Sequence, residues 1–334
     1  MKLLGIETSC DDTAASVVGD DGVLSNVIAS QDSLHADYGG IVPELAARRH
    51  LETVQDVVRK AMTDAAATFA DLDGIAVTRG PGLVGSLLVG LSAAQGLGLR
   101  TGLPVVGVNH LEGHVLSPLI HDDLEPPFLS LLVSGGHTAL YLVREVGDYA
   151  EVAATRDDSA GEAFDKAAKM LGLGYPGGRV IDETARAGDP EAFRFPRGRV
   201  RSDPLALSFS GLKTALWDFL REREGAAPVE DVCASFQESI VDVLVDRVRR
   251  AADRLGVNRV AVAGGVSANS RLRACMQEEC ERRGARLVMP PMSLCTDNAA
   301  MIAAAALMRR RRGLGGEPLQ AVSRLPLGPR LASS

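Results

Sequence analysis

Two histidines spaced four residues apart, His110 and His114, form the pattern in this sequence with the clearest chemical meaning. They follow a short apolar run that ends at Val108, and residues four apart lie on the same face of a helix. Two imidazoles on one face can bind a single metal ion and leave positions for a carboxylate, a substrate or water. The spacing predicts a metal site, although two histidines that only cap or pack a helix would give the same pattern.

Glu112 lies between these histidines but is not spaced to act with them. At about 100° per residue, its side chain is turned roughly 200° around the helix from His110. In metalloproteases with two histidines four residues apart, the general-base glutamate directly follows the first histidine. The carboxylate of Glu112 is therefore expected to point away from the metal face, and peptide hydrolysis on that template is disfavoured.

A third metal ligand must come from elsewhere in the chain, and the polar turn at 295–298 is the best candidate. This turn precedes an Ala-rich helix expected over 299–308, and Asp297 offers a carboxylate. The alternative is that Thr296 or Asp297 is only a helix cap. Nothing in the local sequence connects Asp297 to the histidines.

Two glycine-containing turns could bind an anion. Ser-Gly-Gly at 134–136 follows an apolar run, and Gly-Gly at 264–265 joins an expected strand at 259–263 to an expected helix from Ser270. Backbone N–H groups in such turns, helped by the dipole of a following helix, attract phosphate groups. Each turn alone is more typical of a simple tight turn. Two of them facing each other in a duplicated fold favour a nucleotide site.

A helix is expected over 161–169, and two interpretations of its charged residues remain open. Glu162 with Lys166, and Asp165 with Lys169, are spaced as ion pairs on a solvated helix face. A glycine-rich stretch follows at 171–178, so Asp165 could instead line a ligand site.

The elements that position these residues form two similar halves. Segments 2–19 and 128–143, about 125 residues apart, each consist of an apolar run, a polar turn and a second apolar run. Each predicts a β-hairpin. Short β-branched runs at 74–77 and 105–108 flank an apolar helix, and amphipathic helices are expected over 44–67 and 230–255. The pattern predicts a duplicated α/β architecture with a cleft between its halves.

Length and composition agree with this plan. The chain has 334 residues, of which 46% are hydrophobic and 24% charged, which fits about two globular domains. The net charge of −7 does not suggest unaided nucleic-acid binding. Five scattered cysteines without a CxxC pair argue against a disulfide framework and fit a reducing compartment.

The N-terminal residues indicate no secretory signal, so a cytoplasmic protein without a membrane segment is expected. The uncharged stretch 80–99 has the length of a membrane span, but its glycines favour a turn followed by a buried helix.

Several motifs taken together resemble a known family. They are GIETSCDDT at 5–13, HADYGGIVPE at 35–44, GPGL at 80–83, HLEGH at 110–114, LVSGGHT at 132–138, GEAFDK at 161–166, SFSGLK at 208–213 and GGVSAN at 264–269. In this order, over about 2–308, they resemble the TsaD (Gcp) family of bacterial tRNA N6-adenosine threonylcarbamoyltransferases, once described as glycoproteases.

The resemblance implies a duplicated actin, sugar kinase and Hsp70-like (ASKHA) α/β fold, with two lobes around a nucleotide cleft. We expect a first lobe over 1–115 that ends with the histidine pair. A second lobe over 116–308 would carry the adenylate-binding turns, and its last helix could return to the first lobe. An Arg-rich segment and a poorly ordered tail are expected over 309–334. The cluster Arg309–Arg312 would be a solvated helix end, with a tRNA-backbone contact as the alternative.

The resemblance also implies the reaction. The threonylcarbamoyl group of L-threonylcarbamoyl-AMP would move to N6 of adenosine 37 in tRNAs that read codons beginning with A, and AMP would be released. The expected partners are threonylcarbamoyl-AMP, tRNA and the companion proteins TsaB and TsaE.

Site residues follow from the same resemblance. The metal ligands would be His110, His114 and Asp297, holding one divalent ion per subunit, iron(II), with zinc as the alternative. Independently of the resemblance to this family, which often has glutamate at the position of Asp12, Asp11 or Asp12 is a candidate proton acceptor. The residues expected to touch the adenylate are Leu132, Val133, Ser134, Gly135, Gly136, Asp165, Gly178, Asp182 and Asn269.

Three other functions compete with this interpretation. A small-molecule kinase of the same fold would use Mg²⁺ and an acidic base, and would not need the histidine pair. A metalloprotease would need a general-base glutamate directly after the first histidine, and Glu112 does not occupy that position. A nucleotide-binding scaffold without catalysis would not depend on His110 or His114.

Overall fold

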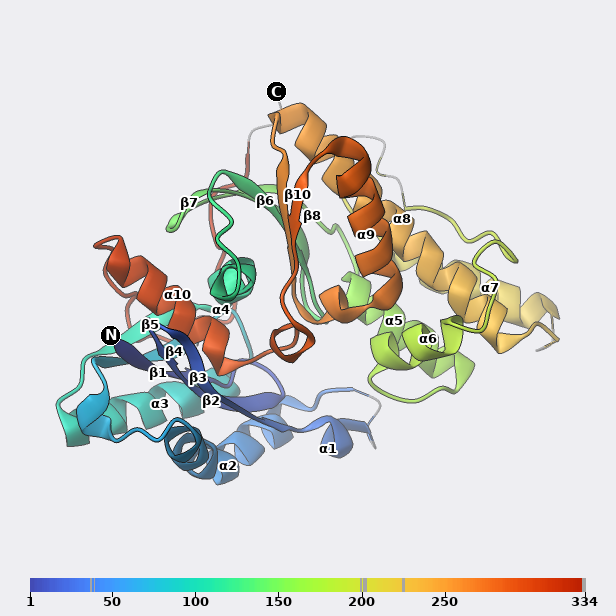
Figure 1. Cartoon of the computed structure of the whole chain (residues 1–334). Coiled ribbons are helices and arrows are strands. Elements are labelled where there is room, and N and C mark those ends of the chain that lie inside the picture. Colours follow the sequence, from blue (N-terminus) through green and yellow to red (C-terminus); the bar gives the residue numbers. More distant parts are fainter. Residues whose placement is uncertain (37, 39, 199, 201–202, 224–225, 332–334) are drawn as a thin grey trace. The chain divides into compact units, whose positions relative to one another are not determined.

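The computed structural model describes residues 1–36, 38, 40–198, 200, 203–223 and 226–331 (Figure 1). These residues form two compact units. The first contains Met1–Asp123, Glu145–Tyr149 and Thr296–Pro329, and the second contains Leu124–Arg144, Ala150–Cys295 and the chain from Arg330 onward.

The first unit is built on a five-stranded sheet with the order β3-β2-β1-β4-β5. Strands β1 (Lys2–Glu7), β2 (Asp12–Gly19) and β3 (Gly22–Ser30) form an antiparallel meander, whereas β4 (Gly74–Gly80) and β5 (Val105–Asn109) continue the sheet in parallel to β1. The residues of β1, β2 and β4 are almost all buried, which suits strands covered on both faces, whereas the edge strand β3 is mostly only partly buried.

Helices cover both faces of this sheet (Figure 1). Leu4 and Ile6 of β1 pack into a core with α2 (Pro43–Asp64) and α3 (Val84–Thr101). Between them, Gly5 faces α10 (Ala299–Arg311) on the other side, where a Cβ atom would lie 2.3 Å from the carbonyl oxygen of Ala299. The unit is completed by α1 (Asp32–Ala36), η1 (Phe69–Asp71), α4 (His110–Leu116) and η2 (Ser117–Ile120).

The second unit repeats the same topology with the next five strands. Its sheet has the order β10-β9-β6-β7-β8, formed by β6 (Phe128–Val133), β7 (Thr138–Glu145), β8 (Asp148–Ala154), β9 (Arg259–Ala263) and β10 (Arg286–Val288). β6 and β7 are antiparallel, and β9 and β10 continue in parallel from β6. Read from its other edge, this order matches the first sheet strand for strand, so the predicted duplication is confirmed.

The remaining helices of the second unit pack around its core. They are α5 (Ala160–Leu171), α6 (Gly177–Ala185), α7 (Ser210–Arg223), α8 (Val229–Leu255) and α9 (Ser270–Arg283), with η3 (Gly265–Ala268) and η4 (Met292–Leu294). Gly256 and Gly284, both at positive φ, end α8 and α9.

The chain after α10 differs from the poorly ordered tail that its composition suggests. Within the described residues up to Leu331, Glu317 exchanges two backbone hydrogen bonds with Gly107 of β5, each 3.1 Å long. The N–H of Val322 donates to the carbonyl oxygen of Arg79 at 2.8 Å. The glycines of this segment lack side chains and its prolines lack backbone N–H donors. Its other backbone groups are still sufficient to pair with the edge of a sheet. Residues 332–334 lie outside the described part.

The expected boundaries at 115 and 308 also differ from the two units. Residues 116–123 stay with the first unit rather than with the second, in which they are expected. The last helix does return to the first unit, as expected, because the chain rejoins that unit at Thr296 with α10. Among the described residues, no helix combines the length and the apolar composition that crossing a bilayer needs. All five cysteines are free.

Candidate active site

Both histidines are placed by the junction between β5 and α4. Asn109, the last residue of β5, caps α4 because its Oδ1 accepts a hydrogen bond from the N–H of Leu111 at 2.9 Å. One turn apart on α4, the buried rings of His110 and His114 have centroids 4.7 Å apart and planes at 88°. The prediction that they share a helix face is confirmed.

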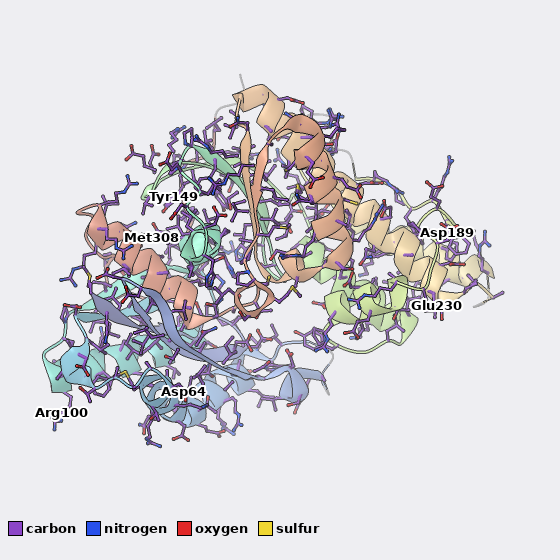
Figure 2. The ribbon with its side chains drawn as sticks, viewed as in Figure 1. Asp64, Arg100, Tyr149, Asp189, Glu230 and Met308 are labelled. Carbon is purple, nitrogen blue, oxygen red and sulfur yellow. The ribbon has the colours of Figure 1, made fainter. Side chains whose placement is uncertain are left out.

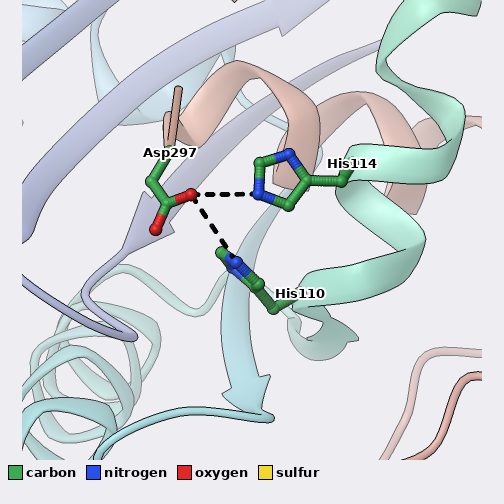
Figure 3. Close-up of side chains that lie close together, drawn as sticks. All are labelled: His110, His114 and Asp297. Carbon is green, nitrogen blue, oxygen red and sulfur yellow. Dashed lines mark hydrogen bonds and ion pairs between the residues drawn. The ribbon is translucent and has the colours of Figure 1, made fainter. Parts of the chain in front are cut away.

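Asp297 reaches the histidines from the turn before α10 (Figure 3). Its Oδ1 lies 2.9 Å from Nε2 of His114 and 3.7 Å from Nε2 of His110. Asn298, rather than Thr296 or Asp297, caps α10 by accepting from the N–H of Met301 at 2.9 Å. The cap therefore leaves the carboxylate of Asp297 directed at the histidine pair.

The donor set formed by these three residues suits a divalent metal ion. One ligand atom from each residue lies within 4.8 Å of the others, and the set combines two imidazole nitrogens with a carboxylate oxygen. Three protein ligands of this kind leave coordination positions for water or a substrate. The arrangement fits iron(II) and zinc equally well in ligand type.

Glu7 contacts the ring nitrogen Nδ1 of His110. The sequence alone did not identify Glu7 as a site residue. This buried carboxylate lies 2.9 Å from Nδ1 of His110 and accepts from the hydroxyl of Thr78 at 2.6 Å. Burial alone would lower the pKa of His110, but the carboxylates of Asp297 and Glu7 outweigh it and raise that pKa to about 9. The sequence signal that could have identified Glu7 is an acidic residue at the end of the otherwise apolar strand β1.

Asp11 and Asp12 lie in the first unit, in and just before β2. Burial, followed by the charge of Asp297, raises the pKa of both carboxyl groups, that of Asp12 to about 8. Among the described residues, no hydrogen-bond donor reaches Oδ1 of Asp12. Both acids thus share a unit and an electrostatic environment with the candidate metal ligands.

Glu112 points away from the histidine pair, as the helical spacing predicts. Its Oε1 accepts from the hydroxyl of Tyr149 at 2.7 Å and from Nη1 of Arg309 at 3.0 Å. The metalloprotease arrangement, with a glutamate beside the metal, is therefore not formed.

Three of the four arginines at the end of α10, Arg310 to Arg312, are exposed, as expected for a solvated helix end, whereas Arg309 is partly buried. Arg309 pairs with buried Glu112, and Arg310 donates to the carbonyl oxygen of Asp73 at 3.2 Å. Arg311 pairs with Asp20 at 2.6 Å, and Arg312 lies 3.8 Å from a carboxylate oxygen of Glu145. Only Arg309 departs from the expectation, because its acidic partner Glu112 lies far away in the sequence, where local patterns do not reveal it.

All nine expected adenylate-binding residues lie in the second unit. The turn 134–136 joins β6 to β7 and is closed by the N–H of Ser134, which donates to the carbonyl oxygen of His137 at 2.7 Å. Gly135 and Gly136 are exposed, and a Cβ atom on either would meet nothing within 4 Å. Leu132 and Val133 are buried strand residues, so only their backbone could reach a ligand.

The two glycine turns of the second unit lie side by side. Gly264 adopts a φ of +90°, and a Cβ atom there would lie 2.3 Å from the carbonyl oxygen of Val133. The start of α5 packs against the first turn, because a Cβ atom on Gly161 would lie 2.6 Å from the carbonyl oxygen of Ser134. The first turn and the strand before it therefore leave no room for a side chain at Gly264 or at Gly161.

Side chains of the expected site connect the first turns of further helices. Asp165 of α5 accepts from the N–H of Gly177 at 2.7 Å, where α6 begins, and Gly178 follows directly. Asp182 of α6 accepts from the N–H and hydroxyl of Ser270 at 3.2 and 2.7 Å, where α9 begins. The start of α6 is thus linked to α5, and the start of α9 is linked to α6. Helix N-termini favour anions.

Asn269 has a structural role in this arrangement. Its Oδ1 caps α9 by accepting from the N–H of Leu272 at 2.9 Å, and its Nδ2 donates to Oε1 of buried Gln237 at 2.6 Å. Gln237 was not identified from the sequence, because only the fold brings α8 to this cap.

Comparisons with known proteins agree with the geometry. The family model described as "TsaD: tRNA N6-adenosine threonylcarbamoyltransferase" matches residues 22–304. A protein of that name from Geotalea uraniireducens is 52% identical over 91% of this chain and 90% of its own. One from Clostridium botulinum (strain Kyoto / Type A2) is 48% identical over 99% of each chain.

Solved structures with low sequence identity support the fold. HypF from T. kodakarensis superposes with a TM-score of 0.63 at 14% identity, covering 93% of this chain and 48% of HypF. Component A of (R)-2-hydroxyglutaryl-CoA dehydratase from Acidaminococcus fermentans gives 0.54 at 15% identity, covering 93% and 99%. The duplicated ASKHA-type fold is confirmed, and the chain belongs to the tRNA N6-adenosine threonylcarbamoyltransferase (TsaD) family.

Proposed function

We propose that this chain is a tRNA N6-adenosine threonylcarbamoyltransferase, which attaches a threonylcarbamoyl group to N6 of an adenosine in tRNA. The observation that carries this conclusion is the 48% identity to an enzyme of that name over 99% of both chains. The kinase and protease alternatives have no comparable support, and Glu112 is engaged by Tyr149 and Arg309 rather than by a metal site.

For the donor we propose threonylcarbamoyl-AMP, and for the acceptor adenosine 37 of tRNAs that read codons beginning with A. The adenylate would bind the second unit at the turn 134–136 and beside the starts of α5, α6 and α9. Exposed backbone at Gly135 and Gly136 and the helix dipoles suit a phosphate that leaves as AMP.

We propose one divalent ion per subunit, iron(II) with zinc as the alternative, held by His110, His114 and Asp297. When bound, the ion supplies a Lewis acid for the negative charge that develops on the transferred carbonyl oxygen. The chain's own contribution is orientation. Glu7 engages Nδ1 of His110, so that Nε2 is the nitrogen presented to the site.

Asp11 or Asp12 is the proposed proton acceptor for the adenine amine. Both lie in the unit that carries the histidines, and burial raises the pKa of both carboxyl groups, that of Asp12 to about 8, toward the range in which a general base is most effective. The amine of adenine is a weak nucleophile, so correct orientation contributes more than a strong base.

We also propose that the chain works in the cytoplasm, where ribosomes use its tRNA product, with companion proteins TsaB and TsaE. The net charge of −7 supports a need for partners, since an acidic protein gains affinity for tRNA by borrowing basic surface.

The test is nucleoside mass spectrometry on tRNA from cells depleted of their own enzyme and supplied with this chain. The wild type should restore threonylcarbamoyladenosine, and the His110→Ala/His114→Ala double variant should not. His121→Ala, an exposed histidine near the same helix, is the matched control and should restore it. Failure of the folded wild type with companions present would refute the activity, and restoration by the double variant would refute the metal site.

A further inference from the structure

Three consecutive residues of α4 contact α10 at successive places along its length. His114 bonds to Asp297, just before the helix begins. A Cβ atom on Gly113 would lie 2.9 Å from Cδ1 of Ile302 and 3.1 Å from Cγ of Met301. Glu112 pairs with Arg309 near the end of α10. These contacts extend over residues 297–309, of which the helical part 299–309 spans about 15 Å at 1.5 Å per residue.

The glycine contact alone does not fix how α10 lies on α4. Gly113 allows close approach, but it has no side chain to interlock with Met301 or Ile302. A helix can rotate or slide over such a smooth contact at low cost, because side chains in ridges and grooves normally define the packing. α10 also packs on the first sheet, where a Cβ atom on Gly5 would lie 2.3 Å from the carbonyl oxygen of Ala299. That packing sets the distance of the helix from the sheet, and a directional contact away from the crossing point is still needed to define the rotation and register of α10 on α4.

The contact between Glu112 and Arg309 meets this need. Glu112 is 1% exposed, and its Oε1 receives both the hydroxyl of Tyr149 and Nη1 of Arg309. The guanidinium is held on its other side by the carbonyl oxygen of Gly315, at 3.3 Å from Nε and 3.2 Å from Nη2. Figure 2 labels Tyr149 and, in α10, Met308, the residue before Arg309. Both partners of the pair are thus anchored by further groups of the first unit.

A buried ion pair usually adds little to the stability of a protein, since apolar residues of similar size often stabilise it equally well. Its directional bonds instead favour one arrangement over others. At the other end of α10, Asp297 has to lie within reach of both histidines. A rotation or shift of the helix would move Asp297 together with its backbone.

We propose that Glu112 and Arg309 are a positioning pair, which fixes α10 on α4 and thereby holds Asp297 where it can share a metal ion with His110 and His114. The inference rests on the metal site of the proposed function. It also gives Arg309 a role that neither a solvated helix end nor a tRNA contact would explain.

The test measures Co²⁺ binding to the full-length protein, by competition with a chromophoric chelator and by the visible absorption of the bound ion. The informative variant is Glu112→Gln/Arg309→Met, which removes both charges together and leaves neither buried alone. We expect its Co²⁺ affinity to fall by about 10–100-fold, as for other residues that orient metal ligands, and its absorption to change. Arg311→Met, which breaks an exposed ion pair in the same helical turn, should bind as the wild type does.

The outcomes separate this inference from the proposed function. If the wild type does not bind Co²⁺, or if His114→Ala binds it unchanged, the metal site itself is wrong. If the wild type binds and the folded double variant matches it in affinity and spectrum, the positioning role is overturned. Should the double variant not fold, Arg309→Lys decides. Lysine keeps the positive charge but loses the guanidinium N–H groups that bond to the carbonyl oxygen of Gly315. Unchanged affinity in Arg309→Lys would also overturn the proposal, whereas a several-fold loss supports it.

Discussion

At the scale of single residues, Glu7 is the side chain whose role is easiest to isolate. It is fully buried at the end of β1, and it contacts His110, Thr78 and the backbone of Ser9. Burial works against its charged form, but His110 holds the pKa of Glu7 below its ordinary value. A carboxylate in this place fixes the ring of His110 and makes its other nitrogen a better ligand.

We therefore predict that Glu7→Gln weakens divalent metal binding by about 10–100-fold while the protein stays folded. The amide can still accept a hydrogen bond, but it lacks the charge that supports His110. Zn²⁺ titration against a chelator measures the effect. Glu52→Gln, which alters an exposed acid on α2, is the control. Equal affinity in the two variants would contradict the orienting role of Glu7.

At the scale of elements, glycines reveal where strands and helices approach closely. A Cβ atom on Gly5 would lie 2.3 Å from the carbonyl oxygen of Ala299 and 3.0 Å from Cβ of Ala303. Both neighbours belong to α10, so Gly5 sets the distance between β1 and the helix that follows Asp297. In α3, by contrast, a Cβ atom on Gly96 would meet nothing within 4 Å.

Gly5→Ala and Gly96→Ala should consequently have opposite effects on stability. The first should lower the free energy of unfolding by about 1–3 kcal/mol or more, because a backbone oxygen cannot move aside easily. The second should raise it by about 0.5–1 kcal/mol, the usual gain when alanine replaces glycine inside a helix. Urea unfolding of both variants measures this. A neutral Gly5→Ala would mean that α10 is not packed closely on β1.

The start of α7 depends on an acid from a distant part of the second unit. Asp157 accepts from the N–H of Phe209 at 2.7 Å, from the N–H of Ser210 at 3.2 Å, and from the hydroxyls of Ser208 and Ser210 at 2.6 and 2.8 Å. Partial burial opposes its charge, but these donors hold the pKa of Asp157 below its ordinary value of 3.8. It therefore caps α7 from outside the helix, and it explains the serines of the SFSGLK motif.

Because the pKa of Asp157 is lower in the folded protein, this residue should stabilise the protein only at pH values at which its carboxyl group is ionised. Its contribution is fully present above the ordinary pKa of 3.8 and is lost as the pH falls through the lower folded value. Asp157→Asn should cost about 1 kcal/mol near neutral pH, a typical value for a helix cap at an exposed position. Unfolding curves from about pH 7 to about pH 3 should show this difference shrinking. A difference independent of pH would contradict the electrostatic origin.

At the scale of the whole molecule, local patterns predicted the repeated units but not the long-range contacts. The hairpins, the strands at 74–77, 105–108 and 259–263, and the helix 230–255 follow from alternation and helical periodicity, and the structure contains them all. The histidine pair follows from spacing within one helix. Asp297, by contrast, is 183 residues from His114, and only the return of α10 to the first unit brings them together. Arg309 and Glu112 escaped prediction for the same reason.

The segment after α10 gives the last prediction, because it covers an edge of the first sheet. β5 is the edge strand, and Glu317 pairs with Gly107 in its middle. A Cβ atom on Gly316 would lie 2.4 Å from Cβ of Val106, so the segment lies directly on β5. The side chain of Glu317 also pairs at 2.6 Å with Arg79, a residue only 8% exposed. The segment therefore closes a strand edge and neutralises a buried cation.

Ending the chain after Gly313 should lower the melting temperature by several degrees and promote aggregation, since an uncovered edge strand can pair with other molecules. Glu317→Gln isolates the charge effect and should cost about 1–3 kcal/mol, because Arg79 then lacks its carboxylate. Ending the chain after Leu331 is the control and should change neither property. Thermal melting followed by light scattering distinguishes these cases. If the protein ending at Gly313 melts like the full chain and stays monodisperse, the segment does not protect β5.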